Sequence, residues 1–177
     1  VYTSVKKGAL VDASAEQIGN GGTVVVCSDI KNPKSKTLAQ GTLLAKGGSI
    51  SGDGGKIETS GYQLITKGIK TSVKSMHGKS GKWLLDPFNI VIGSSATGTA
   101  FSDSDPGDDT YTSNATSEVL ASDISTALTN GDVTIQTGGS TGDGNGDGDI
   151  IVNAAIAKSS GSDSTLTLKA HNDVTVN

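Results

Sequence analysis

Short runs of alternating apolar and polar residues recur along the chain, separated by glycine-rich turns. In Val133–Gln136 and in Leu166–Lys169 every second residue is apolar. A period of two places successive side chains on opposite faces of a β-strand, so each run predicts a half-buried strand. The ten predicted strands are Thr23–Ser28, Gly41–Ala45, Lys56–Thr59, Gln63–Thr66, Trp83–Leu85, Asn89–Ile92, Asp132–Gln136, Asp149–Asn153, Thr165–Lys169 and Asp173–Val176.

The length and spacing of these runs favour a solenoid over a β-sandwich. Strands of roughly 3 to 6 residues are shorter than typical sandwich strands. Glycine residues precede several of these runs, and the starts of the glycine-preceded runs are roughly 14 to 20 residues apart. This spacing is close to one coil of a parallel β-helix. Such coils bury their apolar residues against one another and need no bulky core. The sequence therefore predicts an all-β chain that folds as a parallel β-helix.

One segment has the periodicity of a helix instead. Leu120, Ile124 and Leu128 are four residues apart and lie on one helical face, and Asn130-Gly131 provides a stop. We expect a short helix near residues 117–129, lying across an end or a flank of the solenoid. The expected organisation is coils over 1–92, an irregular loop over 93–116, the helix over 117–130 and further coils over 131–177.

Strand alternation also predicts which side chains form the core. The lone cysteine, Cys27, shares a face with Val25 and is predicted to be a small buried residue. One cysteine excludes an intrachain disulfide and a zinc framework. The predicted core residues are Val24 and Val26 or their alternates, with Leu43, Ile57, Leu85, Ile135, Ile150, Val152, Leu166, Leu168, Val174 and Val176.

Composition and charge narrow the function classes. Aromatic residues make up 3% of the chain, which fits the narrow core of a solenoid. All 14 basic residues are lysines and the net charge is −4, so the sequence argues against nucleic-acid binding. Residues 1–86 carry 12 lysines and 6 acids, whereas residues 87–177 carry 2 lysines and 12 acids. Two solvated faces of opposite sign explain this asymmetry, and head-to-tail contact or cation capture are the alternatives.

The sequence predicts that the chain is not an enzyme. No nucleophile elbow, zinc-protease motif or phosphate-binding loop occurs in it. The two histidines, His77 and His171, both lie in turn-like stretches. Paired carboxylates such as Asp108 and Asp109 lie in polar loops rather than on a strand face, where glycosidase-type chemistry would need them.

A calcium ion is the one candidate cofactor. Asp143, Asn145, Asp147 and Asp149 place oxygen ligands at every second position, with glycine at the sixth, as in the first half of a calcium loop. The twelfth position is Ala154, where a bidentate glutamate belongs. A turn rich in glycine and aspartate is therefore the alternative interpretation.

The bulkiest apolar segment of the chain contains its only tryptophan. We expect Trp83, Leu84, Leu85, Asp86 and Pro87 to have a structural role, with Trp83 closing or plugging a coil. Pro87 restrains the preceding residue from helical conformations. A ligand-stacking role for Trp83 is the alternative.

This segment carries a family resemblance. Residues 54–61 (GGKIETSG) and 81–92 (GKWLLDPFNIVI) resemble the GGxxETSG and WLLDPxNIxI signature of large two-partner-secretion exoproteins. These are the filamentous-haemagglutinin-like and high-molecular-weight adhesins of Gram-negative bacteria. Residues 22–29 and 41–48 are similar to the family upstream, with Cys27 where a tryptophan is usual, and 148–153 and 166–170 resemble its later coils.

The resemblance implies a right-handed parallel β-helix within a secreted virulence-type adhesin at the bacterial cell surface. It implies export by an outer-membrane β-barrel partner and contact with an unidentified receptor or glycan on a host or bacterial cell. The N-terminal secretion domain is not evident, so we expect an internal segment of a larger protein. Some relatives are glycosylated at Asn-x-Ser/Thr sites, which makes Asn114 a candidate acceptor. The alternatives are a carbohydrate-active β-helix enzyme and an extracellular filament-forming protein that associates end to end.

Overall fold

The computed structural model describes residues 1–95, 117–138 and 148–177 and shows a parallel β-helix with one short helix. Every strand pair within these ranges is parallel. The elements are β1 (Tyr2–Val5), β2 (Leu10–Asp12), β3 (Thr23–Cys27), β4 (Lys36–Ala39), β5 (Thr42–Leu44), β6 (Lys56–Gly61), β7 (Gln63–Ile65), β8 (Lys70–Ser72), β9 (Lys82–Pro87), β10 (Ile90–Gly93), β11 (Ser117–Leu120), α1 (Ala121–Leu128), β12 (Asp132–Gln136), β13 (Ile150–Val152), β14 (Leu166–Lys169) and β15 (Val174–Val176).

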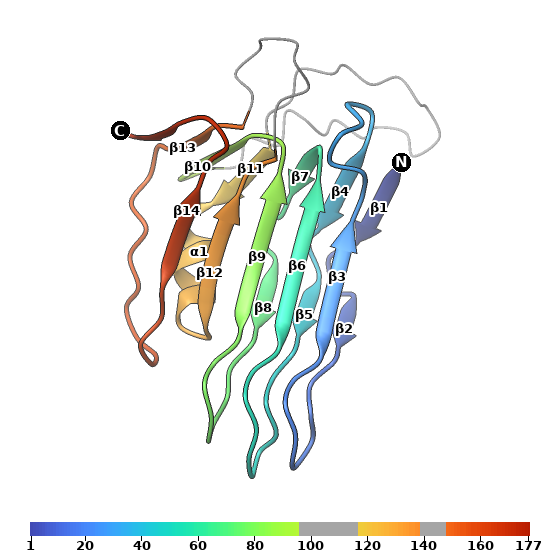
Figure 1. The fold of residues 1–177 in the computed structure, drawn as a ribbon, viewed down its shortest axis with the longest axis vertical. Coiled ribbons are helices and arrows are strands. Elements are labelled where there is room, and N and C mark those ends of the chain that lie inside the picture. Colours follow the sequence, from blue (N-terminus) through green and yellow to red (C-terminus); the bar gives the residue numbers. More distant parts are fainter. Residues whose placement is uncertain (96–116, 139–147) are drawn as a thin grey trace.

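Three sheets run along the solenoid. One has the strand order β1-β4-β7-β11-β10-β13-β15, the second β14-β12-β9-β6-β3 and the third β2-β5-β8. In Figure 1 the chain climbs the five-stranded sheet in front, crosses at the top to the strands behind and returns to the bottom. Each strand of the five-stranded sheet lies to the left of the one before it in the chain, so the winding is right-handed, as the family resemblance implies.

The length of a coil differs from the sequence-based prediction. Residue 23 pairs with residue 56, and residue 56 with residue 82, so successive coils take 33 and 26 residues. The predicted spacing of roughly 14 to 20 residues is therefore wrong as a coil repeat. Gly41 precedes β5 of the three-stranded sheet, whereas Gly54-Gly55 precedes β6 of the five-stranded sheet. The glycine runs mark corners between sheets within a coil.

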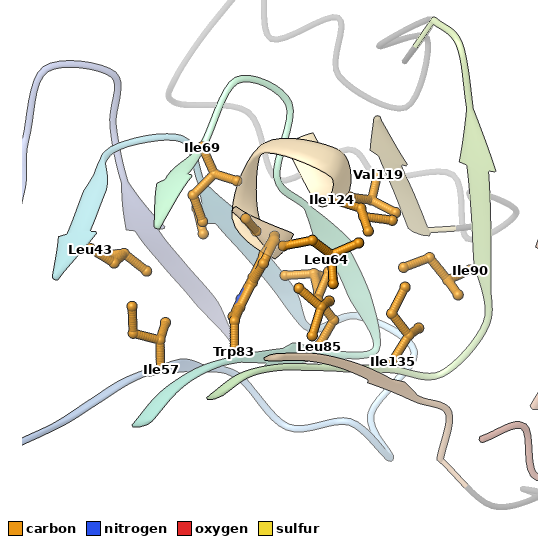
Figure 2. Close-up of a cluster of buried hydrophobic side chains, with 14 of the residues drawn as sticks. Leu43, Ile57, Leu64, Ile69, Trp83, Leu85, Ile90, Val119, Ile124 and Ile135 are labelled. Carbon is orange, nitrogen blue, oxygen red and sulfur yellow. The ribbon is translucent and has the colours of Figure 1, made fainter. Parts of the chain in front are cut away.

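The core consists of inward-facing side chains stacked in register along the axis. Val24, Ile57, Trp83 and Val133 occupy one row on successive strands of the five-stranded sheet, and all four are buried. Figure 2 shows Trp83 rising from this sheet into the interior between Ile57 and Leu85. Close packing of each row on the next gives the narrow core that the composition predicts.

Two sets of predicted core residues lie outside the core. Val24 and Val26 point inward, so Val25 and Cys27 point outward and are exposed, and the buried placement of Cys27 was wrong. Val174 and Val176 are also exposed, since β15 is the outermost strand of its sheet. The remaining predicted core residues, including Leu43, Ile57, Leu85, Ile135, Ile150 and Val152, are buried, while Leu166 and Leu168 pack partly buried against the core.

The predicted helix is shorter than expected. Residues 117–120 form the strand β11, and the helix spans Ala121–Leu128. Ser117 and Val119 pair with Ile90 and Ile92 of β10, and this ladder satisfies backbone groups that a longer helix would have used. Helix α1 follows a strand of the seven-stranded sheet, as β8 does in the preceding coil, and buries Ile124 in the core.

The seven-stranded sheet contains one strand out of sequential order. β11 lies between β7 and β10, although β10 precedes it in the chain. β11 therefore lies one strand back along the axis from β10. The irregular loop predicted over 93–116 lies outside the described residues, apart from positions 93–95.

Candidate functional site

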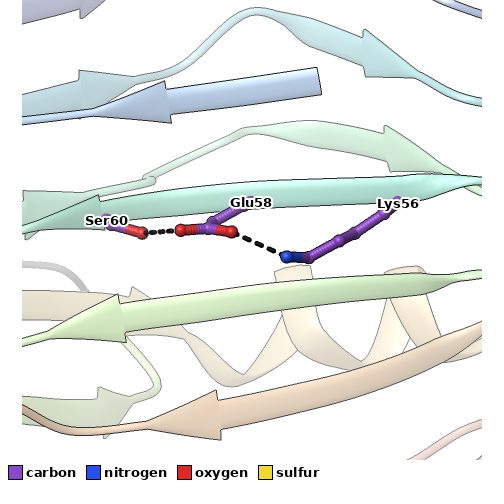
Figure 3. A network of polar contacts seen from close by, with 3 residues as sticks. All are labelled: Lys56, Glu58 and Ser60. Carbon is purple, nitrogen blue, oxygen red and sulfur yellow. Dashed lines mark hydrogen bonds and ion pairs between the residues drawn. The ribbon is translucent and has the colours of Figure 1, made fainter. Parts of the chain in front are cut away.

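A row of polar side chains covers part of the outer face of the five-stranded sheet. On β6, Ile57 and Thr59 point into the core, so Lys56, Glu58 and Ser60 point outward. The ammonium Nζ of Lys56 lies 2.8 Å from Oε2 of Glu58, and the Ser60 hydroxyl donates to Oε1 at 3.0 Å (Figure 3). The Glu58 carboxylate is thus held between a positive charge and a hydroxyl.

Parallel pairing brings a second carboxylate to this row. Asp86 of β9 lies opposite Ser60 in register and is partly buried. Its Oδ1 atom is buried and has no hydrogen-bond partner among the described residues. Burial, with the nearby negative charge of Glu58, raises the pKa of Asp86 above its ordinary value. The hydrogen bond from Lys56 holds the pKa of Glu58 below its ordinary value.

Two neighbouring carboxyl groups therefore have pKa values displaced in opposite directions. Glu58 is ionised at neutral pH, whereas Asp86 takes up a proton more readily than an ordinary aspartate. This difference is the pattern by which acid and base roles are divided in carboxylate chemistry. No sequence pattern indicates this pair of carboxyl groups, because the two residues come together only through the strand register.

Replacing Asp86 by asparagine is expected to stabilise the protein at neutral pH. Because the pKa of Asp86 is raised in the folded state, the folded protein binds more protons than the unfolded one between the ordinary pKa of 3.8 and the folded-state pKa. As pH rises through this interval, the contribution of Asp86 to the free energy of unfolding therefore falls. We expect Asp86→Asn to raise Tm at pH 7, with a gain that shrinks below pH 4. Thermal melts across this range test it, with the exposed Asp163→Asn as the control. An equal change in Tm at pH 7 and below pH 4 would contradict a raised pKa for Asp86.

The predicted calcium ligands are only partly within the described residues. Asp143, Asn145 and Asp147 lie outside them. The carboxylate of Asp149 accepts hydrogen bonds from Nδ2 of Asn172 at 2.8 Å and from the backbone N–H of Asp173 at 3.1 Å. Asp149 thus joins two successive turns of the chain, and calcium binding there stays a prediction. Across the described ranges no group of three histidine, cysteine or acidic side chains could hold a metal ion.

The residues of the tryptophan segment belong to β9 and point alternately inward and outward. Trp83 is 1% exposed, and its indole Nε1 donates to the hydroxyl of Thr59 at 3.1 Å. Leu85 and Pro87 also point inward, whereas Leu84 and Asp86 point outward. Just beyond this strand, Phe88 stacks on Tyr62 with ring centroids 4.5 Å apart. A buried indole with its N–H satisfied is typical of a core residue.

Asn114, the predicted glycosylation site, lies outside the described residues. Within the part of the chain that the structure describes, no helix has the length and hydrophobicity to cross a membrane. In comparisons with known proteins, no family model and no curated protein matches the chain.

Proposed function

We propose that this chain is a β-helical segment of a large protein secreted to the surface of a Gram-negative bacterium, where it acts as a rigid stalk or an adhesive module. The observation that carries the proposal is that the signature residues coincide with the structural needs of the solenoid. Gly54 and Gly55 lie at the tight corner before β6, and Trp83 and Leu85 form successive inward positions of β9. The resemblance of these residues to two-partner-secretion exoproteins supplies the cellular context.

The architecture suits a load-bearing spacer. Parallel ladders hold each coil to the next, and the rows that include Val24, Ile57, Trp83 and Val133 form a continuous core along the axis. Since each coil contacts only its neighbours, the length of such a protein grows by adding coils without a change of design. Export as an unfolded chain through an outer-membrane β-barrel partner, followed by folding outside, is compatible with a fold that has no intrachain disulfide.

The test of this proposal is surface exposure on intact bacteria. Antibodies raised against the purified segment are expected to label cells that express the full-length protein. Labelling is expected to disappear when the gene of the partner β-barrel is deleted, with a periplasmic marker as the control for cell integrity. Labelling only after the cells are lysed, in the presence of the partner, would contradict the proposal.

A second candidate function follows from Glu58 and Asp86. The two carboxyl groups lie on one sheet face in neighbouring strands and their pKa values are displaced in opposite directions, which supports the carbohydrate-active alternative as the second function. Cleavage of a surface polysaccharide by the purified chain, abolished by Glu58→Gln, would support this second function. Equal cleavage by the wild type and the variant would assign the activity elsewhere.

A further inference from the structure

Three stacked loops project beyond the sheets at one side of the solenoid, at the bottom of Figure 1. They connect β2 to β3, β5 to β6 and β8 to β9 and comprise residues 13–22, 45–55 and 73–81; we call them the tips. Backbone hydrogen bonds join each tip to the next. The N–H of Ala15 donates to the carbonyl of Lys46 at 3.0 Å, and that of Gly47 to the carbonyl of Lys74 at 3.0 Å. The tips therefore continue the ordered stack.

The parts of the tips that lead into the next strand are joined by hydrogen bonds from backbone N–H groups to side-chain oxygens. Oδ1 of Asn20 accepts from the backbone N–H of Asp53 at 2.8 Å, and Oδ1 of Asp53 accepts from that of Lys79 at 2.8 Å. Gly52 has a φ of +130°, and a Cβ atom there would lie 1.9 Å from the carbonyl oxygen of Gly19. This close backbone packing leaves the apical side chains on a rigid support.

Each tip presents one large apolar side chain to solvent. Ile18 is 72% exposed, Ile50 is 58% exposed and Met76 is 69% exposed. Residue 18 bridges to residue 51, so the first two tips are paired close to their apices. Neighbouring coils are separated by about 4.8 Å, so these three exposed side chains lie on successive tips; we call them the apolar strip. Their exposure gives them no part in the core.

The tips carry a small excess of positive charge. Residues 13–22, 45–55 and 73–81 contain three lysines and two acids, whereas the whole chain has a net charge of −4. The third tip and the start of β9 carry Lys74, Lys79 and Lys82 with no acid, beside Met76. Exposed aliphatic side chains flanked by lysines are the combination that favours the surface of an anionic bilayer.

We propose that the three tips dock on a membrane surface that contains anionic phospholipids, with Ile18, Ile50 and Met76 entering the headgroup region and the lysines contacting phosphate groups. This inference rests on the proposed function, because it gives the cell-surface segment a target on an apposed membrane. The rigid stack presents all three side chains together, so their small individual contributions add without an ordering cost at binding.

Flotation of the purified chain with lipid vesicles tests the proposal. The probes are phosphatidylcholine vesicles and vesicles in which about one-third of the lipid is phosphatidylserine. We expect binding to the anionic vesicles that weakens as salt rises. The triple variant Ile18→Ser, Ile50→Ser, Met76→Ser is expected to lose binding by at least about tenfold. Lys74→Gln and Lys79→Gln are each expected to weaken it by about fivefold.

The matched control is Val25→Ser, which removes an exposed valine from the outer face of β3, away from the tips. It is expected to bind the anionic vesicles as the wild type does. No flotation of the wild type with anionic vesicles, or full binding by the triple variant, would overturn the proposal. A dimer in sedimentation that forms without vesicles and depends on the tips would assign the strip to a second copy and overturn it also. These outcomes concern purified protein and are independent of the labelling experiment on cells.

Discussion

Replacing Trp83 by alanine is expected to lower the free energy of unfolding by about 3–5 kcal/mol. The indole is 1% exposed and lies in one inward row with Ile57 and Val133, so its loss leaves a cavity in the middle of the stack. The change also leaves the Thr59 hydroxyl without the donor that reaches it at 3.1 Å. Urea denaturation followed by circular dichroism measures this loss.

Two further variants separate the volume of Trp83 from its hydrogen bond. Trp83→Phe retains most of the apolar volume and loses the donor to Thr59, so an intermediate loss is expected. Val25→Ala, at an exposed outward position of β3, is expected to change stability by less than about 0.5 kcal/mol. A loss under about 1 kcal/mol for Trp83→Ala would contradict the core placement of the indole.

The second large effect is expected from Gly54→Ala. A Cβ atom at residue 54 would lie 1.8 Å from the carbonyl oxygen of Val73 and 2.4 Å from the backbone nitrogen of Gly81. Both neighbours are backbone atoms of the next coil, so the coils must separate for a methyl group to fit. We expect a loss of about 2–4 kcal/mol in the free energy of unfolding.

Gly138→Ala provides the matched control for this substitution. The nearest atom to a Cβ at residue 138 would be Cδ1 of Ile30 at 3.7 Å, which is an ordinary contact. We therefore expect a small change in the same denaturation experiment. If both glycine variants unfold at the same denaturant concentration, the coils do not approach each other as closely as described.

The strands with a clear apolar pattern were predictable from the sequence, and those with a weak one were not. In β12 and β14 the buried and solvated positions alternate in the residue types themselves. β8 consists of Lys70-Thr71-Ser72, which has no apolar residue, and it forms because β5 provides a parallel template beside it. β1, β2 and β4 were also missed, because their apolar patterns are weak and they are stabilised by pairing with strands of neighbouring coils.

The features that depend on long-range register were beyond sequence reasoning. Nothing in Ser117–Leu120 shows that it inserts between β7 and β10, since that order depends on pairing between distant segments. The same holds for Glu58 and Asp86, which become neighbours only when residue 60 pairs with residue 86. Cys27 points outward because Val24 and Val26, rather than Val25 and Cys27, face the core. The residue types of Val24–Cys27 alone do not decide which of these two sets faces inward.

The in-register stacking of the coils is the claim on which the stalk and membrane proposals both depend, and a distance between spin labels tests it most directly. Cys27, Ser60 and Asp86 form one outward row, and the register continues it through Gln136 to Lys169. Cys27 is exposed and is the only cysteine, so Lys169→Cys gives a doubly labelled protein.

Four strand spacings separate the two labelled positions, which places their Cα atoms about 19 Å apart. We expect a single narrow distribution of label distances close to this value, widened only by the label side chains. A broad distribution, or a mean distance beyond about twice this value, would show that the strands do not stack in this order.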